Sequence, residues 1–162
     1  GSDYYKVNPK GYVPLLVLDD GTPISEASVI LQYLADQKPG TLAPAFGSLA
    51  RWKMMELLTF LATEVHKGFS ALWNPATPAE VRKGAVDRLG TRFDILAQTL
   101  AKQPYLTGDK FSIADAYLFV LLNWTKIHKV DLGRWPALTE FQSRVAARAA
   151  VQATFKAEGL VK

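Results

Sequence analysis

Only one short stretch of this sequence has the pattern of β-strands, and helical spacing dominates the rest, which limits the folds that the chain can adopt. Residues Val13–Leu18 (VPLLVL) form a compact apolar run without helical spacing. The turn Asp19–Gly21 follows, where the glycine can take a positive φ, and residues 22–24 can return as a second short strand. Two strands and one helix cannot close a core, since an isolated hairpin is only marginally stable in water. We therefore interpret the N-terminal module as incomplete.

A short helix is predicted after the hairpin, and a linker after that helix. Ser25 is the expected N-cap residue, because its hydroxyl can accept a hydrogen bond from a free backbone N–H one turn on. The buried face of the helix is predicted to consist of four apolar residues: Val29, Ile30, Tyr33 and Leu34. Residues 37–47 (QKPGTLAPAFG) contain two prolines and two glycines and are typical of a linker.

The chain after this linker is predicted to be helical throughout. One long helix is expected from about Trp52 to His66, because apolar residues step by three and four along it. Thr77 is the expected N-cap of the next helix, with Pro78 at its first position and Glu80 closing a capping box. One apolar stripe is predicted along that helix: Val81, Ala85, Leu89, Phe93, Leu96 and Leu100.

A more hydrophobic helix is predicted to follow and to occupy the centre of the bundle. Ser112 and Asp115 have the spacing of a capping box at its start. Residues 116–122 are apolar on every side, which is typical of a helix surrounded by others. Trp135–Pro136 indicates the start of another helix, and a short C-terminal helix completes a bundle of about five or six.

Composition excludes several classes of protein. Hydrophobic residues make up 49% and charged residues 21% of the 162, which excludes a disordered chain. No run reaches the roughly 18 apolar residues that a membrane span needs, and the N-terminus lacks a signal-peptide pattern. The chain has no cysteine and two histidines, so we expect no disulfide, no cysteine nucleophile and no metal site. A cytoplasmic globular protein without a membrane partner is therefore expected.

The net charge of +4 is distributed unevenly but without clusters. Residues 1–36 carry a net charge of −3 and residues 37–162 carry +7. Lysines and arginines are scattered, with no run of five or more, which favours a solvated helical surface over a stripe that follows phosphates. We therefore expect no nucleic-acid partner, although a basic nucleic-acid-binding bundle is one alternative.

Four stretches in this order carry a resemblance to a known family. They are Asn8–Pro14 (NPKGYVP), Ser25–Leu34 (SEASVILQYL), Ala62–Phe69 (ATEVHKGF) and Thr107–Asp115 (TGDKFSIAD). With them, the sequence resembles the glutathione transferases over essentially its whole length, and most closely the bacterial beta-class-like members.

This resemblance implies an α+β fold with two modules. Residues 1–36 would be the C-terminal half of a thioredoxin-like α/β module, residues 37–47 a linker, and residues 48–162 the all-α C-terminal bundle of a glutathione transferase. The implied activity, which serves detoxification, is conjugation of reduced glutathione to a hydrophobic electrophilic small molecule by a homodimer. Glutathione would be a co-substrate, and no cofactor is implied. The alternative is a non-catalytic glutathione-transferase-like module for binding or assembly.

The resemblance also has a departure. Members of the family begin with a strand, a helix and a further strand before the NPKG segment, and their catalytic Ser, Tyr or Cys lies there. This chain starts almost at that segment, so we expect the catalytic residue to lie outside it. No catalytic residue is assigned, and we expect this chain by itself to be inactive.

Two of the resembling stretches imply main-chain contacts with glutathione. Val13–Pro14 resembles the cis-proline signature of the thioredoxin-like fold, in which Val13 would pair its backbone with the cysteinyl unit as an added strand does. An ordinary trans proline at the start of a strand is the alternative. Ala27 would offer its N–H at a helix N-terminus to the γ-glutamyl carboxylate, and Glu26 would receive the γ-glutamyl ammonium. Without the resemblance, Ser25-Glu26 is simply a helix start.

Four polar residues complete the implied glutathione site. Asn8 and Lys10 lie in the turn before Val13, although Asn-Pro-Lys-Gly is also a favourable turn sequence. His66 and Lys67 would lie near the sulfur and the glycyl end of glutathione, where a cation or an imidazole stabilises a thiolate. A partly exposed histidine on an amphipathic helix is the alternative for His66.

Other residues receive weaker assignments. Ser112 and Asp115 are interpreted as a structural cap rather than a nucleophilic pair, because no histidine is near in sequence. Tyr117 and Trp124 either line the apolar half of the cleft or belong to the core. By resemblance, Glu64 or Thr59 would reach the ligand of a neighbouring subunit.

Overall fold

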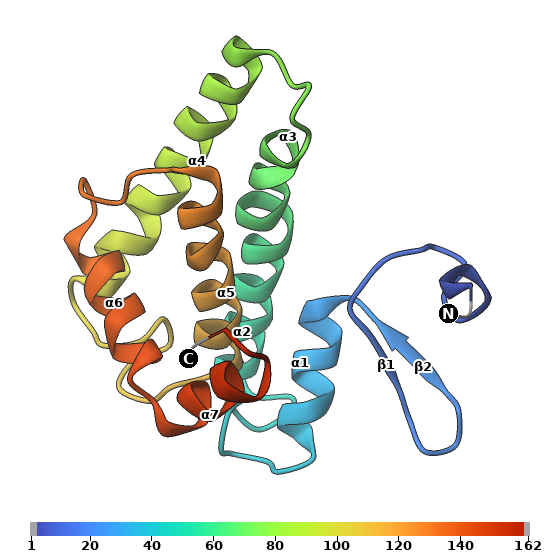
Figure 1. Ribbon diagram of the computed structural model, residues 1–162. Coiled ribbons are helices and arrows are strands. Elements are labelled where there is room, and N and C mark those ends of the chain that lie inside the picture. Colours follow the sequence, from blue (N-terminus) through green and yellow to red (C-terminus); the bar gives the residue numbers. More distant parts are fainter. Residues whose placement is uncertain (1–2, 161–162) are drawn as a thin grey trace.

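A computed structural model describes residues 3–160, in which a small hairpin module stands beside a helical bundle (Figure 1). The module contains the short 3-10 helix η1 (Tyr4–Lys6), the strands β1 (Leu15–Val17) and β2 (Pro23–Ser25), and helix α1 (Ala27–Asp36). The strands are antiparallel, with Leu16 opposite Ile24. Strand β1 is shorter than the predicted apolar run, because Val13 and Pro14 lie before the ladder in an exposed loop, and β2 lies one residue later than the predicted residues 22–24.

The predicted N-cap of helix α1 is wrong. Ser25 is the last residue of β2 and pairs with Leu15, so its backbone is extended and belongs to the sheet. Glu26 stands at the N-cap position instead, with φ of 71° and no hydrogen bond from its side chain to the helix. The first turn of α1 is therefore left without a side-chain cap.

The bundle contains more elements than the sequence indicated. They are α2 (Leu49–Phe60), the π-helical segment η2 (Leu61–His66), the 3-10 turn η3 (Lys67–Phe69), α3 (Ser70–Trp73), α4 (Ala79–Leu100), α5 (Ile113–His128), α6 (Pro136–Ala146) and α7 (Ala149–Ala157). The predicted long helix to His66 is thus interrupted at Leu61, where the hydrogen bonding changes to the wider π pattern. Apolar spacing did not reveal this change, because Leu61 and Val65 remain fully buried across it.

The capping predictions have mixed outcomes. Thr77 is not a cap, since α4 begins at Ala79 and Pro78, with an extended ψ of 145°, occupies the N-cap position. Asp115 does close the start of α5, where its carboxylate accepts hydrogen bonds from the N–H and the hydroxyl of Ser112 at 2.8 and 2.7 Å. Pro136 occupies the first turn of α6, as predicted.

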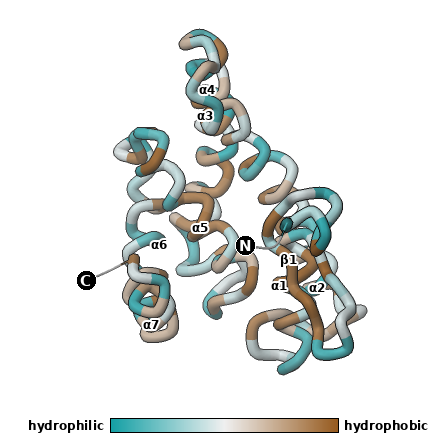
Figure 2. The backbone as a smooth tube through the Cα atoms, turned by 45° about the vertical axis from the view of Figure 1, so that its right-hand side comes forward, coloured by the Kyte–Doolittle hydropathy of each residue, from teal (hydrophilic) through white to brown (hydrophobic). Residues whose placement is uncertain are grey.

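Helix α5 lies at the centre of the bundle, where it packs against α1, α2, η2 and α6. Most of its residues are buried, and Figure 2 shows it as a mainly hydrophobic segment among the other helices. Val120 departs from the prediction, because 48% of its surface is exposed. No helix within residues 3–160 combines the length and the apolar character needed to cross a membrane.

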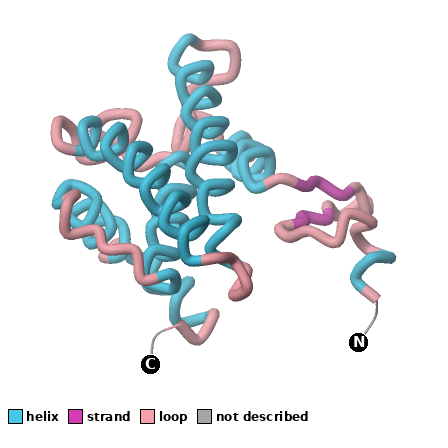
Figure 3. Tube along the Cα trace, turned by 90° about the horizontal axis from the view of Figure 1, so that it is seen from above, coloured by secondary structure: helices cyan, strands magenta, loops and turns pink. Residues whose placement is uncertain are grey.

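An ion pair between a buried arginine and an exposed aspartate joins the two modules. Arg51 of α2 is 2% exposed and donates two hydrogen bonds of 2.7 Å to the carboxylate of Asp36 at the end of α1. The guanidinium also donates to the carbonyl of Pro44 in the linker. Seen from above, the hairpin lies to one side of the helices, beyond α1 (Figure 3). The pair therefore fixes α1, and with it the hairpin, against the bundle.

Candidate functional site

A pocket of about 440 Å³ lies between the hairpin module and the bundle. Its walls come from the loop before β1, the junction of β2 with α1, the segment η2–η3, and α5. All eight residues predicted to contact glutathione line it: Asn8, Lys10, Val13, Pro14, Glu26, Ala27, His66 and Lys67. The lining also contains Tyr117, for which the sequence left a cleft and a core position open, and four residues that the sequence did not assign to it: Gly11, Tyr12, Ser25 and Ala62.

The loop before β1 is held by Asn8. Asn8 is 6% exposed, its amide donates to the carbonyl of Tyr12 at 2.7 Å, and its Oδ1 accepts the N–H of Lys10 at 3.1 Å. Gly11 turns the chain with φ of 69°, a conformation that glycine adopts without a steric penalty. Both ends of the Asn8 amide are therefore engaged within the turn, so the role that the structure gives this residue is to shape the loop.

Val13 follows this turn with its backbone outside the β1–β2 ladder. The Val13–Pro14 peptide bond is cis, as expected, and 79% of Val13 is exposed. An extended peptide could pair with the main chain at this position without displacing a strand.

The N-terminus of α1 forms a second wall of the pocket. The first hydrogen bonds of the helix run from the N–H groups of Val29 and Ile30 to the carbonyl of Glu26, which leaves the N–H of Ala27 outside this pattern. The positive end of the helix dipole therefore faces the pocket beside an exposed carboxylate, that of Glu26. These two groups offer complementary contacts to a ligand that carries both an anion and a cation.

His66 and Tyr117 form a hydrogen-bonded pair in the wall that the bundle provides. His66 Nδ1 lies 2.7 Å from the hydroxyl of Tyr117, although the residues are 51 positions apart. The ring of Trp124 stands edge-on to the imidazole, with 4.8 Å between centroids. Sequence reasoning assigned Tyr117 more readily to the core, and no spacing in the sequence indicates this pair.

Burial changes the acid–base behaviour of this pair. Desolvation, together with the nearby charge of Lys67, lowers the pKa of His66, although Glu26 opposes the shift. Desolvation raises the pKa of Tyr117 to about 12, and the carboxylate of Glu26 adds to that shift. Both side chains are therefore neutral near pH 7, and the exposed ammonium of Lys67 supplies positive charge at this wall.

Three residues that the sequence analysis considered for a ligand contact lie outside this lining. Glu64 forms an ion pair of 2.6 Å with Arg92, and the hydroxyl of Thr59 donates to the carbonyl of Met55 in its own helix. Trp124 contacts His66 but lines a separate apolar cavity of about 530 Å³ together with residues of α5 and α7.

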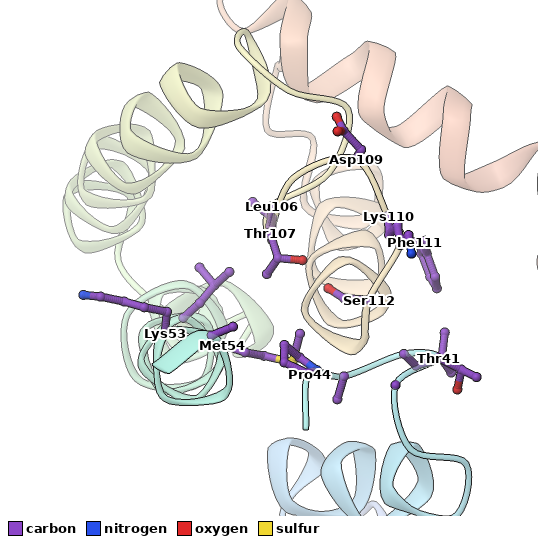
Figure 4. Close-up of a pocket in the computed structure, with 15 residues that line it drawn as sticks. Thr41, Pro44, Lys53, Met54, Leu106, Thr107, Asp109, Lys110, Phe111 and Ser112 are labelled. Carbon is purple, nitrogen blue, oxygen red and sulfur yellow. The ribbon is translucent and has the colours of Figure 1, made fainter. Parts of the chain in front are cut away.

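A larger cavity of about 620 Å³ lies between the linker, α2 and the loop that precedes α5. Figure 4 shows that Lys53 and Asp109 at its edge extend away from its centre, and Lys53 is paired with Glu56 at 2.7 Å. Its lining combines apolar side chains such as Pro44 and Met54 with the hydroxyl groups of Thr107 and Ser112. Within residues 3–160, no group of three His, Cys, Asp or Glu side chains is placed to hold a metal ion.

Comparisons with known proteins agree with this arrangement. Residues 1–37 match the family described as glutathione S-transferase, N-terminal domain, and residues 60–149 match glutathione S-transferase, C-terminal domain. Glutathione S-transferase GstA of Escherichia coli O157:H7 is 43% identical over 162 residues, which are 99% of this chain and 80% of GstA.

Solved structures show the same likeness. The ternary complex of BphK, a bacterial GST, superposes with a TM-score of 0.95 at 49% identity and covers 98% of this chain and 80% of BphK. A sphingomonad glutathione S-transferase complexed with glutathione has a TM-score of 0.93 at 42% identity, covering 99% of this chain and 81% of its own.

Proposed function

The chain belongs to the glutathione S-transferase family, and from this premise we propose that the pocket between its two modules binds glutathione for conjugation to an electrophilic small molecule. One observation carries the proposal. Residues from three separate stretches of the sequence, each selected for a contact with the same tripeptide, line one pocket. No observation favours a non-catalytic assembly module.

The pocket offers one partner for each part of glutathione. The backbone of Val13 would pair with the cysteinyl unit as an added strand does. The N–H of Ala27 and the dipole of α1 would bind the γ-glutamyl carboxylate, and Glu26 the γ-glutamyl ammonium. Lys67 would face the glycyl carboxylate, since it is the cation on the opposite wall. Lys10 would add a second positive charge from the loop.

The same arrangement favours the ionised form of the thiol. Conjugation requires a thiolate, which is the nucleophilic form of a sulfhydryl group. A hydrogen bond from the neutral imidazole of His66 and the charge of Lys67 would both stabilise the anion more than the thiol and so lower the pKa of the thiol.

We also propose that a hydrophobic electrophile binds near Trp124 and that the protein acts in the cytoplasm as a homodimer. Trp124 connects the glutathione pocket to the apolar cavity between α5 and α7, because its ring contacts His66 and lines that cavity. Phe46, Leu49 and Trp52 leave apolar surface exposed at the start of α2, which a second copy could cover. Sedimentation should then give twice the mass of one chain.

Glutathione binding tests the function. We expect isothermal titration calorimetry to show one site per chain, with affinity reduced about tenfold or more in Lys67→Ala, the typical effect of losing a hydrogen bond to a charged group. Lys126→Ala, which removes an exposed lysine from α5, should bind as the wild type does. Absence of binding, or an equal loss in both variants, would refute the proposal.

A further inference from the structure

We infer that Tyr117 is a positioning residue: its hydroxyl donates to Nδ1 of His66, so that Nε2 carries the imidazole proton and presents a hydrogen-bond donor to an anion in the pocket. The inference deepens the proposed function, on which it rests, because the anion in question is the thiolate of glutathione. It makes His66 a donor to the sulfur and excludes it as the base that removes the thiol proton.

The direction of the hydrogen bond follows from the partners available to the phenol. The hydroxyl of Tyr117 lies 2.7 Å from Nδ1 of His66, and the described part of the chain gives it no other partner. If Nδ1 carried the proton and donated it, the phenolic proton of a side chain that is 6% exposed would have no acceptor among the protein groups of residues 3–160. A neutral imidazole has one donor and one acceptor nitrogen, so a donating phenol places the proton on Nε2.

The surroundings hold both rings in this relationship. His66 ends the π-helical segment η2, which is anchored by the buried side chains of Leu61 and Val65. Two residues further on, a Cβ on Gly68 would lie 2.7 Å from Cδ2 of Leu89, so only glycine allows α4 to approach so closely. Trp124 stands edge-on to the imidazole. The orientation of His66 is thus set by packing on α4 and α5 as well as by Tyr117.

The consequence for the site concerns Nε2. The imidazole lines the pocket together with Lys67, and within residues 3–160 no protein group is hydrogen-bonded to Nε2. An N–H aimed at an anion in a partly buried pocket stabilises the anion, and it needs no proton transfer to do so. Without the Tyr117 hydroxyl, either nitrogen could carry the proton, and the donor would be present for only part of the time.

The tautomer can be observed directly, because the chain has two histidines. Long-range ¹H–¹⁵N correlation spectra of histidine-labelled protein distinguish the two neutral tautomers, and the His66→Gln variant identifies the signals of His66 by their loss. We expect the Nε2–H form in the ligand-free wild type and a mixture of forms in Tyr117→Phe. Tyr105→Phe is the matched control, since the Tyr105 ring is half-buried and packs edge-on to Phe111. It should leave His66 unchanged.

The second readout is the pKa of the glutathione thiol in the complex, followed by the ultraviolet absorbance of the thiolate. Tyr117→Phe should raise this pKa by about one unit, which makes the fraction of thiolate about tenfold smaller at a pH below the pKa. His66→Gln, whose amide can donate from near the position of Nε2, should keep more thiolate than His66→Asn, whose shorter amide reaches only the position of Nδ1.

The outcomes separate this inference from the proposed function. A predominant Nδ1–H form in the wild type, an unchanged tautomer in Tyr117→Phe, or an unchanged thiol pKa in that variant would each overturn the role of Tyr117. Failure of the wild type to bind glutathione in calorimetry would refute the proposed function itself. The spectra of the ligand-free protein would still show whether Tyr117 donates a hydrogen bond to His66.

Discussion

Replacement of Asp115 by alanine should destabilise the protein strongly while leaving its affinity for glutathione nearly unchanged. Asp115 is fully buried at the start of α5. Its Oδ1 accepts the N–H of Leu106 at 2.8 Å, and its Oδ2 accepts the N–H and the hydroxyl of Ser112 at 2.8 and 2.7 Å. One carboxylate thus holds both the start of the central helix and the loop that precedes it.

The magnitude follows from the groups that the substitution leaves without partners. Two backbone N–H groups, those of Leu106 and Ser112, would lose their acceptor, at a cost of about 1–3 kcal/mol each. Part of this cost is offset, because burial raises the pKa of Asp115 and so already penalises its charged form in the wild type. A net loss of about 2–4 kcal/mol is expected, which for a chain of 162 residues lowers Tm by roughly 6–12 °C.

Urea denaturation followed by circular dichroism would measure the loss, and calorimetry below the transition would measure glutathione affinity. Asp109→Ala is the matched control, since Asp109 is an exposed carboxylate in the same loop. It should change the free energy of unfolding by less than about 0.5 kcal/mol. A loss of glutathione affinity in Asp115→Ala at an unchanged Tm would refute the structural interpretation of this residue.

Two further predictions concern packing and pH. Gly68→Ala should lower the free energy of unfolding by about 1–3 kcal/mol, because the new Cβ would lie 2.7 Å from Leu89. Gly84→Ala is the control, since its Cβ would lie 3.5 Å from the guanidinium of Arg88. In thermal denaturation this variant should be as stable as the wild type or more stable. The Arg51 guanidinium holds the pKa of Asp36 below its ordinary value of 3.8, so the pair stabilises the fold above about pH 4 and this contribution is lost as the pH falls through the lowered value. As the pH is lowered below 4, the urea midpoint should therefore fall less steeply in Asp36→Asn than in the wild type. An equal pH dependence of the midpoint in the two proteins would contradict a stabilising role of this ion pair.

Local sequence signals predicted which helices and strands form better than they predicted the residues at which these elements begin and end. The hairpin turn, the central helix and Pro136 at the start of α6 follow from side-chain chemistry that acts over a few residues. Ser25 was predicted wrongly as an N-cap. A serine before an apolar helix indicates a cap, but the sequence does not show that its backbone is already paired with Leu15 in a strand. The π-helical turn at Leu61 was not predictable from periodicity, since it changes the backbone hydrogen bonds and leaves the apolar spacing intact.

The candidate site shows a similar division. Resemblance selected residues that the fold then gathered into one pocket, although nothing in their spacing brings Val13 to His66. For Tyr117 the sequence favoured a core position over the cleft because its own helix is apolar, and the hydrogen bond between its hydroxyl and His66 of η2 could not be predicted. The dual character of such a residue, with a buried ring and a hydrogen-bonded tip, depends on tertiary packing alone.

Glu26 combines an unusual backbone conformation with a carboxylate that lines the pocket between the two modules. A residue with a side chain pays a free-energy penalty at a φ of 71°, of order 1–3 kcal/mol, and glycine at this position would remove it. No capping hydrogen bond offsets this penalty, since the Glu26 side chain makes no hydrogen bond to α1. The conformation instead turns the chain from β2 into α1 within one residue, and it places a carboxylate in the pocket beside the free N–H groups of the helix. This exposed carboxylate is the group that we propose for the γ-glutamyl ammonium of glutathione, and such a contact would account for a strained residue that does not cap its helix.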